Sequence, residues 1–299
     1  MKNDFLTNIK YIFIFNKYYI LISLTLVFFI SLIASYDQAN SFSQWYFYYI
    51  AHSKNINYQD IINQIENSFS MFWFNSIFMI SIFVFPIASI VTSKYEVNDM
   101  NQYVLMFNYS RISVFLSYLI SLIVMGFLII LVNWIIFIFI FYYLTGFLEF
   151  YFSLFFFAVV TFILLLFLGG AIGFLIRKTS WSVIISIFLF ILLLMVSAMA
   201  YNNGINYLEH LHNISSVQEY RNAFPLVWKI LVFLNPIYIF RNVVNLLLYP
   251  QTISISSQIS LVDFPSIIFL YLVWYISVIL VGYFIFVYRH PIRKVVKNE

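Results

Sequence analysis

Six long stretches without a charged side chain restrict what this sequence can fold into. About 20 consecutive apolar residues are enough for a helix to cross the ~30 Å hydrocarbon core of a bilayer. The stretches are continuously apolar rather than alternating, which favours helices over the strands of a membrane barrel. We therefore expect an all-α, polytopic membrane protein with six transmembrane helices in a single domain, residues 1–299. The stretches are 18–36, 69–92, 112–144, 150–176, 180–200 and 266–288.

The composition also indicates a lipid environment. Hydrophobic residues make up 64% of the 299 residues, and charged residues only 9%, whereas a soluble domain carries about 25% charged residues. The sequence has no cysteine, which excludes disulfides, thiolate metal sites and a cysteine nucleophile.

The distribution of Lys and Arg predicts the orientation. If the N-terminus is cytoplasmic, eleven of the 15 Lys and Arg residues fall on the cytoplasmic side, as the positive-inside rule requires. We therefore expect a multi-pass protein of the plasma membrane with both termini in the cytoplasm. The shorter outer connections, 37–68 and 145–149, are expected to be a medium loop and a tight turn.

The longest connection, residues 201–265, is expected on the outer side and contains a further apolar stretch, 225–250. Pro236 divides this stretch into pieces too short to span a bilayer, and Asn235 followed by Pro236 is a good helix start. We expect two short helices that enter the outer leaflet and return, with Lys229 and Arg241 reaching back to the surface. An amphipathic pair lying flat on the membrane is the alternative.

Residues 4–17 have a weaker amphipathic pattern, which predicts an interfacial helix before the first span or an extension of that span. Gly169 and Gly173 form a small-xxx-small pair, which favours close helix packing within the chain, dimerisation or a movable helix contact. Pro86 lies inside the second stretch and is expected to kink it, either as a hinge or simply as shape.

The chemistry of the six stretches is limited. They contain no Asp, Glu, Lys, Arg or His, and such residues are what ion-coupled transporters use at bilayer depth. Glu209, His210 and His212 resemble a metal cluster, but the two histidines stand two apart and do not share a helix face. We expect no metal site, no catalytic residue and no cofactor bound by this chain.

The predicted cytoplasmic segment 93–111 contains an apolar helical face. Met100, Tyr103, Val104 and Phe107 recur at spacings of three and four, while Glu96 and Asp99 lie elsewhere on the helix. Such a helix can dock in the groove of a partner protein or lie under the bilayer. Periodicity alone does not separate these two possibilities.

At this segment the chain resembles the type-2 ATP-binding-cassette transporter permeases. The similarity rests on Glu96 before the helix, on Ser110 and Arg111 after it, on segment 234–238 (Leu-Asn-Pro-Ile-Tyr) and on segment 241–244 before the last span. The Gly-Thr that usually follows the glutamate is missing. So are the proline before the Ser-Arg pair and a basic residue early in the third span.

The resemblance implies an export permease. Two permease chains would pair, as a homodimer, above two copies of an ATP-binding subunit, which would bind ATP and Mg. Cargo would be amphipathic or hydrophobic, with a peptide favoured over lipids and drugs, in a low-GC Gram-positive bacterium. A membrane-embedded enzyme and a partner-free channel or carrier are the alternatives. Residues implied to contact the ATP-binding subunit are Glu96, Asp99, Met100, Tyr103, Val104, Phe107, Arg111, Arg177 and Lys178.

Overall fold

A computed structural model describes residues 2–52, 57–97, 110–148, 151–176, 178–209, 217–248 and 260–289. The described chain is helical throughout, apart from short connections. Six of its helices are long and apolar enough to cross a membrane. They are α1 (Lys2–His52), α2 (Tyr58–Val97), α4 (Arg111–Thr145), α5 (Phe152–Leu175), α6 (Thr179–Glu209) and α10 (Phe264–Arg289). Three short helices precede α10, namely α7 (Val217–Ala223), α8 (Leu226–Val232) and α9 (Pro236–Leu248).

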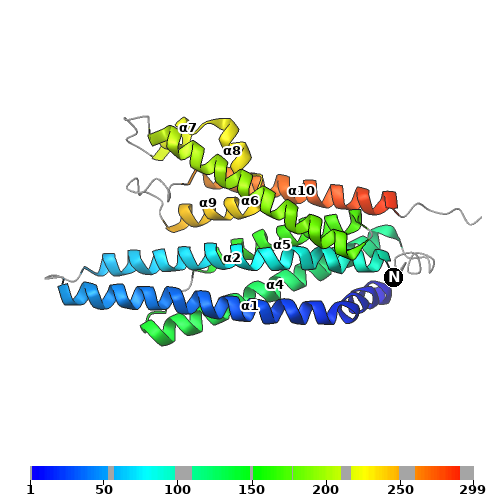
Figure 1. Ribbon diagram of the computed structural model, residues 1–299, viewed down its shortest axis with the longest axis horizontal. Coiled ribbons are helices and arrows are strands. Elements are labelled where there is room, and N and C mark those ends of the chain that lie inside the picture. The colour runs from blue at the N-terminus through cyan, green and yellow to red at the C-terminus, as the bar shows by residue number, and fades with distance from the viewer. Residues whose placement is uncertain are drawn as a thin grey trace, which may run out of the picture.

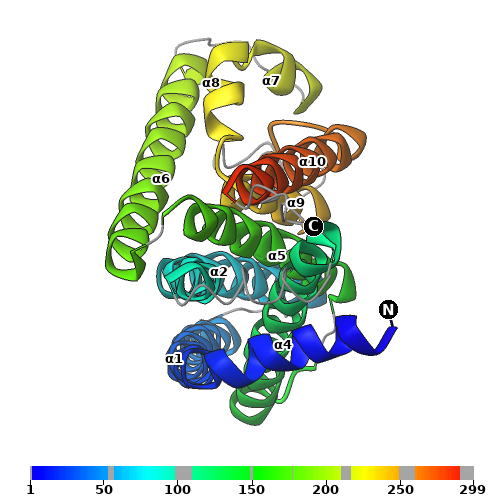
Figure 2. The same cartoon turned by 90° about the vertical axis from the view of Figure 1, so that its right-hand side faces the viewer.

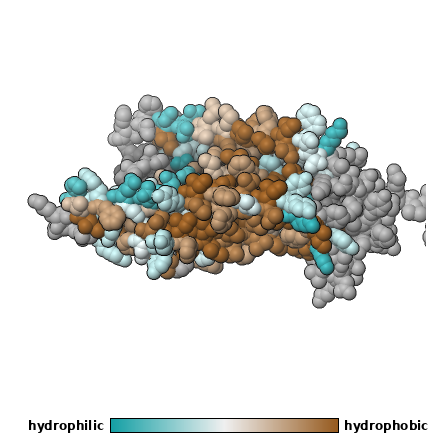
Figure 3. Space-filling view, turned by 60° about the horizontal axis from the view of Figure 1, so that its bottom comes forward, coloured by the Kyte–Doolittle hydropathy of each residue, from teal (hydrophilic) through white to brown (hydrophobic). Residues whose placement is uncertain are grey.

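The six long helices run side by side as one bundle (Figure 1). An apolar belt covers the middle of the bundle, and hydrophilic residues gather towards its two ends (Figure 3). A surface of this kind is stable in lipid and not in water. The chain is therefore a multi-pass membrane protein, as its six uncharged stretches predict.

Two helices form the centre of the bundle. In the most apolar 18-residue stretch of α2 and in that of α5, 61% of the residues are buried. The corresponding stretches of the other four spans are 22% to 33% buried. α1 and α4 pack on one side of this pair, and α6 and α10 lie on the other side (Figure 2). The outer four helices therefore present most of the apolar surface to the membrane.

Both ends of the described chain lie at one end of the bundle, where α1 begins and α10 ends (Figure 1). We call this the terminal end and the other the opposite end. The spanning part of α1 begins at Asn16, and the turns before it run across the terminal end of the bundle (Figure 2). The predicted interfacial segment 4–17 is thus the first part of α1 and turns away from the span.

The segment 37–68 was expected to be a loop, and this prediction is wrong. α1 remains helical to His52 and α2 is helical from Tyr58, so both extend past the opposite end of their neighbours (Figure 1). The α2 helix has 40 residues, about 60 Å, roughly twice the hydrocarbon thickness. The end of an apolar run marks where a helix leaves the lipid and not where the helix stops.

Aromatic side chains hold this helical extension together. Phe42 of α1 lies 5.5 Å from Phe141 of α4 and 5.5 Å from Phe147, measured between ring centroids. The hydroxyl of Tyr49, on α1, donates a 2.8 Å hydrogen bond to Asp60 on α2. Rings at such distances favour edge-to-face and offset contacts, so the extension is a packed part of the fold.

Candidate functional site

The α8–α9 pair is the most unusual element of the membrane domain. Its two helices are bent by 107° at residues 233–235. α6 ends and α10 begins at the opposite end of the bundle, so the pair between them must enter and return on that side. At 13 residues, α9 is about 20 Å long and too short to cross the bilayer. This geometry agrees with the predicted re-entrant pair.

The break falls where the sequence predicts it. The side-chain oxygen of Asn235 accepts a 2.9 Å hydrogen bond from the backbone N–H of Ile237, and Pro236 is the first residue of α9. A capping side chain followed by proline in the first turn is a stable helix start. The three residues between α8 and α9 therefore form the tip of a hairpin inside the apolar bundle.

Two neighbouring helices satisfy the carbonyl groups exposed at this tip. The hydroxyl of Ser197, on α6, donates a 3.0 Å hydrogen bond to the carbonyl of Leu231. The indole of Trp274, on α10, donates a 2.9 Å hydrogen bond to the carbonyl of Phe233. Helix ends leave carbonyls without partners, which is costly in the absence of water. The hairpin is thus tied to α6 and α10 by side chains.

Removing the Trp274 cap should loosen the hairpin without unfolding the bundle. Trp274→Phe keeps an aromatic ring but leaves the carbonyl of Phe233 without its donor, which we expect to cost about 1–2 kcal/mol. Hydrogen exchange measured by mass spectrometry should increase in peptides from α8 and α9 and stay unchanged in α1. Unchanged exchange in α8 and α9 would contradict the capping role. Trp228→Phe, on α8, serves as a control because the Trp228 indole donates no hydrogen bond to any of the described residues.

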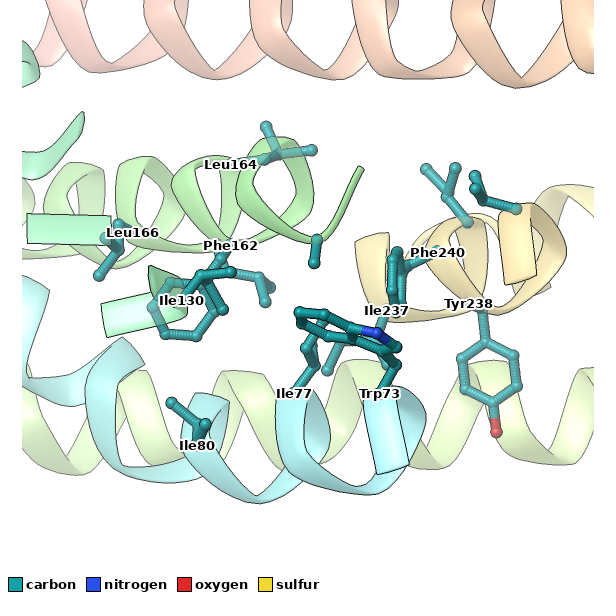
Figure 4. Packing of buried hydrophobic residues seen from close by; sticks show 14 of the residues in the cluster. Trp73, Ile77, Ile80, Ile130, Phe162, Leu164, Leu166, Ile237, Tyr238 and Phe240 are labelled. Atoms are coloured by element: carbon teal, nitrogen blue, oxygen red, sulfur yellow. The ribbon is translucent and has the colours of Figure 1, made fainter. Parts of the chain in front are cut away.

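The α9 helix is packed deep in the bundle. Ile237 and Phe240 of α9 face Trp73 and Ile77 of α2, while Tyr238 points away from them (Figure 4). The rings of Trp73 and Phe240 have centroids 6.4 Å apart. The indole nitrogen of Trp73 and the side-chain nitrogen of Asn235 are buried and have no hydrogen-bond partner among the described residues.

Arg241 is surrounded by aromatic rings from three helices. Its guanidinium carbon lies 4.4 Å from the ring centroid of Tyr201 on α6, 5.2 Å from that of Phe74 on α2 and 6.0 Å from that of Tyr238 on α9. A cation within about 6 Å of a ring centroid is attracted by the ring face. The predicted snorkelling cation is therefore held between helices by its neighbours.

A buried polar network joins α1, α2 and α4 on the other side of the bundle. The hydroxyl of Ser31 donates a 2.6 Å hydrogen bond to Asn133. The amide of Asn133 donates a 3.2 Å hydrogen bond to Ser76. All three side chains are fully buried. Hydrogen bonds between helices add specificity where lipid provides no hydrophobic drive for association.

Gly169 and Gly173 lie on α5, where that helix contacts α2 of the same chain. A Cβ atom at Gly169 would lie 2.5 Å from the carbonyl oxygen of Phe85, and one at Gly173 would overlap Thr92 and Ser89. The hydroxyl of Thr92 donates a 2.9 Å hydrogen bond to the carbonyl of Gly170 across the same contact. The geometry is that of intramolecular packing. Pro86 lies inside α2. The kink expected at this proline stays a prediction.

The terminal end contains the described part of the predicted ATPase contact. Ser110 caps α4 by accepting a 3.1 Å hydrogen bond from the N–H of Ser113. Arg111 begins α4 and Lys178 is exposed just before α6, so both cations lie at the terminal end. Glu96 belongs to the last turn of α2. The remaining predicted contact residues lie outside the described residues: Asp99, Met100, Tyr103, Val104, Phe107 and Arg177.

The Glu209–His212 region is only partly described. Glu209 is the last residue of α6, and His210 and His212 lie outside the described residues. Within the part of the chain that the structure covers, no group of three or more His, Cys, Asp or Glu residues could hold a metal ion.

Sequence reasoning identified Asn235, Pro236 and Arg241 but missed the residues around them. Ser197, Trp274 and Tyr201 are single polar or aromatic residues within apolar runs, and no local spacing marks them. A scan against protein-family models and a search of curated proteins found no match to this chain.

Proposed function

We propose that this chain is the membrane-spanning permease subunit of an ATP-driven exporter of the type-2 ATP-binding-cassette kind. The observation that carries the proposal is the bent α8–α9 pair, placed between the fifth and sixth of six spans and broken at Asn235–Pro236. The order of elements is the one that the resemblance implies. Cargo would leave the cell, and both termini would be cytoplasmic, which makes the terminal end the inner face.

The placement of charge supports an external energy source. The described carboxylates lie on the helical extension of α1 and α2, as Asp37, Asp60 and Glu66 do, or at helix ends. None of them lies within the six uncharged stretches. Arg241 is a cation, and it cannot bind and release a coupling ion as a carboxylate can. The energy for transport would therefore come from a partner that hydrolyses ATP.

In the proposed mechanism, the ATP-binding subunits act on the terminal end of the bundle. Two ATP-binding subunits would dock beneath two copies of this chain, with segment 93–111 as the main contact and Lys178 close to a second one. The segment joins α2 directly to α4, and α2 packs against α5, α6 and α9. Closure of the ATP-binding subunits would move α2 and with it the re-entrant pair. An apolar path between the spans suits an amphipathic cargo, and a peptide is the favoured one.

Co-purification tests this proposal. The full chain with an affinity tag is expressed in its native cells and extracted in mild detergent. We expect an ATP-binding protein in a 1:1 ratio with the chain. A monodisperse, folded chain that purifies without any nucleotide-hydrolysing partner would contradict the proposal.

A further inference from the structure

Two cations lie close together at the opposite end of the bundle, where α7 and α8 are found (Figure 1). The ammonium group of Lys229, on α8, donates a hydrogen bond to the backbone carbonyl of Arg221, on α7. The two positive charges are close enough to repel each other. Both side chains are partly buried, and like charges at such positions are unfavourable unless an anion compensates them. The pair therefore has to be explained by what it binds.

Most N–H groups of these two cations have no partner in the described chain. A guanidinium has five N–H donors and an ammonium group has three. Arg221 uses its Nε in a 3.0 Å hydrogen bond to the carbonyl of Ser260, and Lys229 uses one donor on Arg221. Neither side chain makes another hydrogen bond or an ion pair with the described residues. Four N–H groups of the guanidinium and two of the ammonium group are therefore left for a ligand.

The neighbouring carboxylates do not neutralise the pair. Asp263 interacts electrostatically with Arg221, but its side chain accepts a 3.3 Å hydrogen bond from the N–H of Ser266 and caps α10. Glu219 lies two residues before Arg221 on α7 and is exposed. Within the part of the chain that the structure describes, neither carboxylate forms an ion pair with Arg221 or Lys229. An anion from outside the described chain is therefore needed to compensate both cations.

The pair lies at the level of lipid headgroups. The carbonyl that Arg221 contacts belongs to Ser260, four residues before α10 begins at Phe264. The uncharged stretch of this last span begins at residue 266. Ser260 is therefore close to the point where the span leaves the hydrocarbon, which is where phosphate groups of the bilayer are found.

An exposed apolar face lies beside the pair. Leu226, Val227 and Ile230 are 71%, 67% and 58% exposed, and they share one side of α8 because residues three and four apart are neighbours on a helix. Lys229 directly precedes Ile230 in the same helix. The other side of α8 packs against α6. Acyl chains can therefore cover this face while a headgroup stays at the two cations.

We propose that Arg221 and Lys229 together bind the phosphate group of a membrane phospholipid whose acyl chains lie on the exposed face of α8. The planar N–H edge of arginine matches two oxygens of a phosphodiester, and the ammonium group adds a point charge beside it. The negative charge of the phosphate relieves the repulsion between the cations. A bound lipid would fasten α7 to the re-entrant pair. This site does not depend on the proposed function.

The test uses the full chain in dodecyl maltoside and follows its thermal unfolding by tryptophan fluorescence. Three probes are titrated: dioctanoyl phosphatidylglycerol, dioctanoylglycerol with the same acyl chains but no phosphate, and inorganic phosphate. We expect stabilisation by phosphatidylglycerol alone. Arg221→Gln and Lys229→Gln should each weaken its apparent affinity by about tenfold or more, because charge-assisted hydrogen bonds are lost. Arg221→Lys should be intermediate, since it keeps the charge and loses the planar edge.

Lys178→Gln is the matched control, because it removes an exposed cation at the terminal end of the bundle. The affinity of this variant should stay within about twofold of that of the unmodified chain, since only long-range attraction is lost. Equal stabilisation by dioctanoylglycerol would overturn the proposal, as would an equal response to inorganic phosphate. Unchanged affinity in either glutamine variant of the pair, with an unfolding midpoint close to that of the unmodified chain without lipid, would also overturn it.

Discussion

Gly173→Ala should destabilise the bundle by about 3 kcal/mol, although it adds a single methyl group. The new Cβ atom would overlap the hydroxyl of Thr92 and the backbone carbonyl of Ser89. A backbone carbonyl cannot rotate away, so α5 and α2 would have to separate. Their separation would stretch the hydrogen bond from Thr92 to Gly170 and loosen the two most buried of the six spans.

The measurement is the thermal unfolding midpoint in detergent, which should fall by about 6 °C or more. Gly282→Ala provides a matched control on α10, because the nearest atom to its added Cβ atom lies 3.6 Å away, in Phe115. That substitution should leave the midpoint within about 2 °C, since the contact is an ordinary van der Waals distance. Equal midpoints for the two variants would show that the α2–α5 contact is not as close as the structure has it.

Met100→Asp should reduce ATP turnover stimulated by this chain by more than about tenfold, under the proposed function. Met100 begins the apolar face predicted for segment 93–111, and a carboxylate buried in the cleft of a partner would be strongly unfavourable. Glu96→Lys should act in the same direction, because it reverses a charge within the same predicted contact segment. Both variants should still insert into the membrane, since neither changes a span.

Gln102→Asp is the matched control for this prediction. It introduces the same carboxylate on the opposite side of the predicted helix from Met100. Turnover is measured with the purified complex in nanodiscs, and Gln102→Asp should retain at least about half of it. Normal turnover in Met100→Asp would mean that the segment lies under the bilayer and contacts no partner, which was the alternative left open by periodicity.

The membrane architecture was largely predictable from the sequence, because hydrophobic length is a direct physical requirement of the bilayer. The break at Asn235–Pro236 was predictable for a local reason, as capping and proline act within one turn. The helical extension was not, because residues such as Asp37 and Gln38 signal only that the chain has left the lipid. Helices continue in water when packing such as that of Phe42 supports them.

The candidate site was predictable only in part. Arg241 is recognisable as a charge in an apolar stretch, but its partners Phe74 and Tyr201 are 167 and 40 positions away. Contacts of this kind depend on how helices pack, and a single sequence has no spacing that reveals them. The same holds for Asn133, whose hydrogen bonds reach Ser31 and Ser76 on two other helices.

The most direct test of an ATP-driven permease is transport by proteoliposomes of defined composition. The chain is reconstituted alone and with its ATP-binding subunit, and movement of a fluorescent amphipathic peptide is followed with ATP and with a non-hydrolysable analogue. We predict movement only when the subunit and hydrolysable ATP are both present. Movement by the chain alone, at a rate that ATP does not change, would contradict the proposed function.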